Sequence, residues 1–466
     1  MAVGFFEIQI RAAGADCKSA PYHLPAAEIR GHISPLGAFS PMKFFCCLLS
    51  AVLCGILPLS AAPDPTPFPD QPNKKGLQVQ MVDDALTLGI HHAAINVSYG
   101  SLFDLAGGPG AEPFTWEGRT WFINGGYVKS LDRQIQPLSE KRVAVYLIIL
   151  AYPTKDPAKD SLLLHPAAKA DGKYSIAAFN TATPDGIALY RALTAFLAQR
   201  YSNDGPHGRV CGYIIGNEVN SQWMWYNLGR MPVDKAAAEY EKAVRGAHEV
   251  IRQFSANARC YLSFDHHWTA SMPGISDQES YPTRTFLEHF ARIAKERGDF
   301  AWHLAHHPYP DDLGNPRTWL DKDAWPTDNS PHITFKNLEV ACRWNLRPEL
   351  LWQGQPRRII LSEQGLHCLA TPDGEQLQAA GFAYVWEKVS RLDGIDALIW
   401  HRHVDHAHEG GLRLGLWSFK PGTISEPYKK RQFYDLFLKA GTPAWPEAAT
   451  FALPITGLKS WDELTK

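Results

Sequence analysis

Two glutamates each follow directly on a run of apolar residues that is typical of a buried β-strand. Glu218 ends the stretch 210–218, and Glu363 ends the stretch 357–363. An unpaired charge is costly beside an apolar strand, so both positions indicate a site rather than a solvated face. Two carboxyl groups at one end of a barrel have the chemistry to cleave a glycosidic bond. The alternative is that each Glu only caps a helix or pairs with an Arg.

The elements that must position these glutamates alternate in type along the chain, which predicts β/α units and a parallel sheet. Strand-like segments occupy eight ranges: 88–97, 121–124, 143–151, 210–217, 259–264, 300–306, 358–362 and 395–400. Apolar residues recur with helical period between them, for example over 187–197 and 240–254. We therefore expect one α/β domain, a (β/α)8 TIM barrel. The connections 152–184, 265–284 and 308–334 would form long loops on its C-terminal face.

The N-terminal segment has the pattern of a secretory signal peptide. Residues 42–62 begin at Met42 with a basic residue, continue with an apolar stretch and end in small residues. We therefore predict an upstream extension over 1–41, a signal peptide over 42–62, a Pro-rich linker over 63–84 and the catalytic barrel over 85–466. Pro58 interrupts the apolar stretch and disfavours a membrane anchor. The expected location is secreted or periplasmic, without stable membrane insertion after cleavage.

Composition restricts the partners of the 466-residue chain. Its 46 Lys+Arg against 48 Asp+Glu form no basic stripe, which disfavours nucleic acid as a partner. The 15 Trp, 17 Tyr and 22 Phe fit a carbohydrate partner, because aromatic faces stack on sugars, although large barrels also use aromatics in their cores. Four cysteines follow the signal peptide without Cys-x-x-Cys spacing, and one disulfide of open pairing is possible. They are Cys211, Cys260, Cys342 and Cys368.

In this setting the residues resemble those of clan A glycoside hydrolases, and the nearest group is a family of uncharacterised secreted bacterial barrel proteins. In clan A an Asn-Glu ending strand four supplies the acid/base and a Glu ending strand seven the nucleophile. Our strand count puts Asn217 and Glu218 after the fourth strand and Glu363 after the seventh. The segment 306–310 and Trp400 would close strands six and eight. The resemblance implies a retaining glycosidase but names no sugar, linkage, or endo or exo action.

The remaining candidate residues would bind the sugar. Asn217 would hydrogen-bond a hydroxyl beside the anomeric carbon, and Tyr309 or His307 would orient Glu363 and help keep it ionised. Trp400 would form a stacking floor. Tyr309 and Trp400 have core packing as their alternative.

Residues near the acid/base complete the expected binding set. Trp223 and Trp225 would wall the leaving-group side, with core packing as the alternative. His267 is a further polar candidate, because sugar pockets use hydrogen-bonding histidines.

A metal-dependent barrel hydrolase is a competing interpretation, because ten histidines lie near predicted strand ends. Zinc in such enzymes is held by histidines and an Asp after strand eight, here His92, His267, His307 and Asp405. Against it, His91-His92 is not His-x-His, and adjacent strand residues point to opposite faces. We therefore expect no metal and no cofactor. A barrel that binds glycans without cleaving them is the third interpretation.

Overall fold

The computed structural model describes residues 62–168 and 174–465. The predicted upstream extension and nearly all of the predicted signal peptide therefore lie outside the described residues. Within the described part of the chain, no helix is long and apolar enough to span a bilayer.

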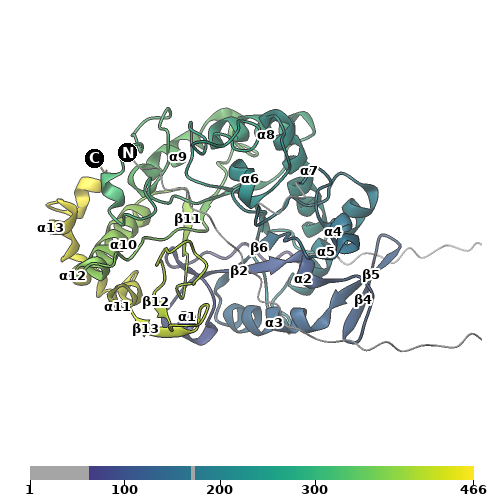
Figure 1. Ribbon diagram of the computed structural model, residues 1–466, viewed down its shortest axis with the longest axis horizontal. Coiled ribbons are helices and arrows are strands. Elements are labelled where there is room, and N and C mark those ends of the chain that lie inside the picture. The colour runs from purple at the N-terminus through teal and green to yellow at the C-terminus, as the bar shows by residue number, and fades with distance from the viewer. Residues whose placement is uncertain (1–61, 169–173, 466) are drawn as a thin grey trace, which may run out of the picture. The chain divides into compact units, whose positions relative to one another are not determined.

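Eight parallel strands close into a barrel with helices packed around it (Figure 1). Around the barrel the strands are β1 (Lys75–Gln78), β2 (His92–Ser98), β6 (Ala144–Leu150), β7 (Gly212–Ile215), β8 (Arg259–Phe264), β9 (Trp302–His306), β10 (Ile359–Leu361) and β11 (Ile395–Trp400). The helices between and after them are α1 (Val82–Thr87), α3 (Gly125–Glu140), α5 (Pro184–Arg200), α7 (Val233–Ile251), α8 (Thr283–Glu296), α9 (Leu338–Trp344), α10 (Gly374–Ser390) and α11 (Gln432–Lys439). The predicted (β/α)8 barrel is confirmed.

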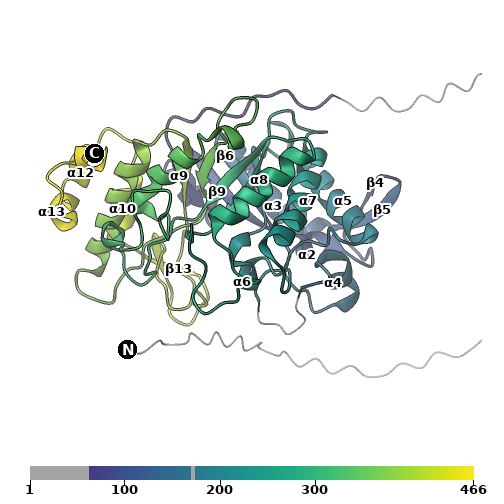
Figure 2. The same cartoon turned by 90° about the horizontal axis from the view of Figure 1, so that it is seen from above.

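Smaller elements decorate the barrel. They are α2 (Tyr99–Leu102), β3 (Phe103–Asp104), β4 (Ala111–Trp116), β5 (Arg119–Asn124), α4 (Pro157–Leu163), α6 (Gln222–Trp225), β12 (Trp417–Phe419), β13 (Pro427–Lys430), α12 (Trp445–Ala449) and α13 (Ala452–Thr456). Strands β3, β5 and β4 form a separate sheet, and β12 pairs with β13. Figures 1 and 2 both place α12 and α13 at one end of this unit and β4 and β5 at the other.

One of the eight predicted strands lies outside the barrel, and one barrel strand was not predicted. The segment 121–124 belongs to β5, which pairs antiparallel with β3 and β4 outside the barrel. The first barrel strand is β1, which lies in the stretch 63–84 that was predicted to be a linker. One false strand and one missed strand cancel in the count, so Glu218 still follows the fourth barrel strand and Glu363 the seventh.

The barrel interior is filled by side chains that range in size from alanine to tyrosine. The Tyr146 and Tyr261 rings meet edge to face inside it, with their centroids 5.8 Å apart. Gly212 makes room for them, because a Cβ there would lie 2.5 Å from the Tyr146 ring. Phe68, from the segment before β1, packs against this interior cluster, and the Arg259 guanidinium stacks on the Phe68 ring at 3.6 Å.

All four described cysteines are free. Cys211 packs inside the barrel, whereas Cys260 packs in the layer between the strands and the helices. The disulfide that the sequence left possible is therefore not formed among them.

Replacing Gly212 tests the interior packing. Gly212→Ala should lower the free energy of unfolding by about 1–3 kcal/mol, because the new methyl group overlaps the Tyr146 ring. Gly108→Ala is the matched control, since a Cβ there meets no atom within 4 Å. Denaturant unfolding followed by Trp fluorescence measures both variants. Equal stability of the two would contradict the packing argument.

Candidate active site

The turn after β7 holds Glu218 in a strained conformation. Gly216 has a φ of +78°, and a Cβ there would lie 2.7 Å from the Tyr226 ring. Glu218 itself has a left-handed backbone (φ 39°, ψ 54°), which is uncommon for a residue other than glycine. Its backbone N–H donates to Ser263 Oγ on β8 at 3.0 Å. Strain of this kind concentrates where a side chain must be aimed.

Glu218 is 8% exposed, and its carboxyl group is held by His307. His307 Nδ1 lies 2.9 Å from Glu218 Oε1, and His307 Nε2 lies 2.9 Å from Ser362 Oγ. Burial raises the pKa of Glu218 to about 7, although the hydrogen bond with His307 acts in the opposite direction. Burial lowers the pKa of His307, but Glu218 and the charge of Glu363 outweigh it and raise that pKa above its usual value.

Glu363 lies beside this pair. An oxygen of Glu218, an oxygen of Glu363 and a ring nitrogen of His307 all lie within 4.8 Å of one another. The Tyr309 hydroxyl donates to Glu363 Oε1 at 3.3 Å. The sequence offered Tyr309 or His307 as the residue that orients Glu363. In the structure Tyr309 contacts Glu363, and the His307 ring is instead directed at Glu218.

A second buried carboxylate supports the turn that follows Glu218. Asp265 Oδ1 accepts from Asn220 Nδ2 at 2.5 Å, and Asp265 Oδ2 accepts from Ser221 Oγ. His267 Nδ1 lies 3.0 Å from Asp265 Oδ2. Burial opposes ionisation of Asp265, but His267 outweighs it and places the pKa of Asp265 well below its usual range. Sequence reasoning missed Asp265, whose signal was its place directly after β8.

Further polar side chains at strand ends were also missed. Gln78 ends β1, and its Oε1 pairs with His401 Nδ1, directly after β11. Gln78 Nε2 also donates to Asn96 on β2 at 3.2 Å. Glu409 holds the other side of His401, at 3.2 Å from Nε2, and bonds Arg402 at 3.1 Å. Gln78, Asn96 and Arg402 line a cavity of about 200 Å³.

The prediction that Trp400 forms a stacking floor for the sugar is wrong. Its side chain is fully buried, its ring meets Phe382 and Phe433 in the layer under the helices, and its Nε1 donates to the Leu414 carbonyl. Trp223 and Trp225, on α6 after Glu218, are only half-buried. Trp225 packs against the cluster that fills the barrel interior.

Asn217 and His267 are both buried. Asn217 is 8% exposed and directly precedes Glu218. His267 is 4% exposed, and the charges of Asp265 and Glu218 raise its pKa against the lowering effect of burial.

The metal set that the sequence suggested does not assemble. His92 starts β2, where its ring nitrogens pair with the Tyr146 hydroxyl and the Asn73 carbonyl. Asp405 pairs with Arg431 instead. His307 is committed to Glu218. The proposed convergence of His92, His267, His307 and Asp405 is therefore wrong.

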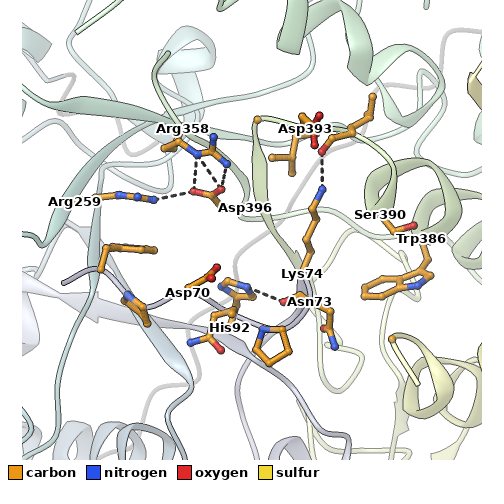
Figure 3. A pocket seen from close by; sticks show the side chains of 18 residues that line it. Asp70, Asn73, Lys74, His92, Arg259, Arg358, Trp386, Ser390, Asp393 and Asp396 are labelled. Atoms are coloured by element: carbon orange, nitrogen blue, oxygen red, sulfur yellow. Dashed lines mark hydrogen bonds and ion pairs between the residues drawn. The ribbon is translucent and has the colours of Figure 1, made fainter. Parts of the chain in front are cut away.

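A cavity of about 790 Å³ lies at the opposite end of the barrel, where strands begin (Figure 3). Arg259 and Arg358 both bind Asp396 there, at 2.8 Å for Arg259. Lys74 Nζ donates to the carbonyls of residues 389 and 392. Each of these cations already has a partner, and functional groups of such barrels gather at the other end. We read this cavity as structural.

Comparison with known proteins places the chain in a family. Residues 67–464 match DUF5722, a family of unknown function. The chain belongs to this family. No curated protein sequence matches it significantly.

Solved structures resemble the chain in fold. A hyperthermophilic β-glucosidase from Pyrococcus furiosus matches with a TM-score of 0.51 and 14% identity, over 80% of this chain and 86% of that one. A family 39 glycoside hydrolase from Bacteroides cellulosilyticus WH2 matches with a TM-score of 0.50 and 10% identity, over 82% of this chain and 66% of that one. At these identities the likeness concerns the (β/α)8 fold of the DUF5722 chain.

The raised pKa of Glu218 makes stability depend on pH. Its pKa rises from 4.5 to about 7 on folding, so folding favours the protonated carboxyl and the protein loses that stabilisation as pH rises through 7. Glu218→Gln cannot ionise and should therefore gain stability over the wild type between pH 5 and pH 9, by about 1–3 kcal/mol. Chemical denaturation of both proteins at pH 5 and pH 9 measures the difference between their free energies of unfolding. The same difference at both pH values would contradict the raised pKa.

Proposed function

We propose that this DUF5722 protein is a glycoside hydrolase that cleaves a poly- or oligosaccharide with retention of configuration, using Glu218 and Glu363. The observation that carries the proposal is the short distance between the two carboxyl groups. An oxygen of Glu218 and an oxygen of Glu363 lie within 4.8 Å of each other. Retaining enzymes place their carboxyl groups about 5–5.5 Å apart, whereas inverting enzymes leave about 6.5–9.5 Å for a water molecule. The barrel fold shared with two glycoside hydrolases supports the same conclusion.

Glu218 is suited to the acid/base role. Its raised pKa keeps a proton available near neutral pH, as proton donation to a leaving oxygen requires. His307 fixes the carboxyl by its Nδ1 contact and is itself anchored to Ser362. When the leaving group departs, Glu218 becomes ionised and then removes a proton from the incoming water.

Glu363 is suited to the nucleophile role. It is more open to solvent than Glu218 and accepts a hydrogen bond from Tyr309, which fixes the direction of its carboxylate. Attack at the anomeric carbon would form a glycosyl ester on Glu363, which water then cleaves. Trp225 and Trp223 follow Glu218 and would wall the leaving-group side. Secretion through residues 42–62 stays a prediction.

Azide rescue separates the two roles. On a panel of 4-nitrophenyl glycosides, Glu363→Ala should lose turnover, and azide should restore it with a glycosyl azide of inverted configuration, because the small anion fills the space of the missing nucleophile. Glu218→Ala should lose about 10²–10⁴-fold on glycosides that need protonation. It should retain the first step on nitrophenyl substrates, and azide should then give the retained product. Product NMR distinguishes these outcomes.

Glu349→Ala is the control, because that carboxylate is 63% exposed and lies outside the site. It should hydrolyse each substrate at the wild-type rate. If folded wild-type protein binds glycans by calorimetry but turns over none of the panel, the protein is a non-catalytic binder. Failure of azide to rescue either folded variant would overturn the retaining mechanism.

A further inference from the structure

Three imidazoles converge beside the candidate active site. His266 and His267 follow β8, and His332 comes from the long loop after β9. A ring nitrogen of each lies within 4.8 Å of the other two. The ring centroids are 4.3 Å apart for His266 and His267, and about 5 Å from each to His332. None of the three belongs to the Glu218, His307 and Glu363 group.

Carboxylates stand behind two of these rings. His332 Nδ1 lies 2.7 Å from Asp311 Oδ1, so Nε2 is the ring nitrogen that faces away from this carboxylate. His267 Nδ1 lies 3.0 Å from Asp265 Oδ2, at ion-pair distance although not aligned as a regular hydrogen bond. Metal-binding histidines almost always have a carboxylate or carbonyl on the ring nitrogen away from the ion.

His266 has a buried ring nitrogen that no hydrogen bond within the described residues satisfies. Its residue is 9% exposed, and its Nδ1 is buried without a hydrogen-bond partner among the described residues. A buried polar atom without a partner loses its hydration with nothing in exchange, and most such atoms in proteins are satisfied. A ligand placed between the three rings would satisfy it.

We propose that His266, His267 and His332 bind a divalent transition-metal ion, with Zn²⁺ the preferred ion. Imidazole suits zinc, copper and nickel, whereas magnesium and calcium prefer oxygen ligands. Zn–N bonds of about 2.0–2.1 Å place tetrahedral ligands about 3.3 Å apart, so small ring rotations would close the site. Three protein ligands leave a fourth position for water or a substrate oxygen.

The metal would tie two loops together next to Glu218. The loops already share backbone bonds, from the Ile333 N–H to the His266 carbonyl at 2.8 Å and from the Trp268 N–H to the Pro331 carbonyl at 2.7 Å. His267 also adjoins Asp265, which bonds Asn220 and Ser221 in the turn after Glu218. An ion here would therefore stiffen the support of the candidate acid/base.

Metal binding by the EDTA-treated, tag-free protein tests the proposal without any substrate. Isothermal titration calorimetry should give one Zn²⁺ per chain, and Co²⁺ should produce a visible absorption band. Mg²⁺ should bind weakly and should not compete with Zn²⁺. Zn²⁺ should also raise the melting temperature, because an ion that binds only the folded chain stabilises it. His266→Ala and His332→Ala should each weaken Zn²⁺ at least about 100-fold. Asp311→Asn should weaken it about 10–100-fold.

His207→Ala is the matched control, because that histidine lies at an ion-pair distance of 3.5 Å from Asp132, away from the three rings. It should bind Zn²⁺ as the wild type does. His332→Gln serves if the alanine variant does not fold, and melting in metal-free buffer checks this. No stoichiometric binding at micromolar Zn²⁺ would overturn the proposal. So would binding that survives His266→Ala and His332→Ala unchanged. Neither result depends on whether the protein hydrolyses glycosides.

Discussion

The contact between His307 and Glu218 is the interaction on which the candidate site depends. A carboxyl group buried at the end of an apolar strand must be neutralised or hydrogen-bonded, since an unpaired buried charge costs several kcal/mol. Among the described residues, His307 is the one side chain seen to hydrogen-bond the Glu218 carboxyl, and Ser362 holds the far side of that ring. Strands β7, β9 and β10 are thereby joined through one imidazole. Burial raises the pKa of the Glu218 carboxyl far enough for it to carry a proton, even though the contact with His307 acts in the opposite direction.

Two buried carboxyl groups near each other are driven to opposite ionisation states. Asp265 has donors from Asn220 and Ser221 and the neighbouring His267, so its charge is stabilised despite burial. Glu218 has fewer donors, so burial raises its pKa, and the negative charges of Asp265 and Glu363 add to that rise. When the surroundings of two carboxyl groups push their pKa values apart, one site can hold both a protonated acid and a fixed negative charge.

The barrel was predictable from the sequence because long apolar strands and amphipathic helices carry strong periodic signals. The errors came from short elements. Strand β1 has four residues and follows a Pro-rich stretch, so its alternation was too brief to stand out. Strand β5 has good strand sequence but pairs with β4, a partner close in the chain, and local patterns do not reveal which partner a strand takes. The two glutamates were found because each closely follows a run of apolar residues, whereas the positions of their partners depend on the paths of loops.

Alternation along the strands accounts for most of what the sequence analysis missed or misplaced. In β11, Ala397 and Ile399 pack inside the barrel, whereas Leu398 and Trp400 pack under the helices. Trp400 therefore had to face outward, and the next residue, His401, had to point toward the barrel mouth.

The same rule holds for β8 and β9. Tyr261 packs inside the barrel, which places Ser263 and Asp265 on the inner side, and Ala305 does the same for His307. Glu363 departs from the rule. Ile360 packs inside, so Ser362 inherits the inner position and Glu363 falls on the outer one. The chain must therefore turn after Ser362 to bring Glu363 to the Tyr309 hydroxyl. That turn depends on the loop 363–373, which periodicity does not describe.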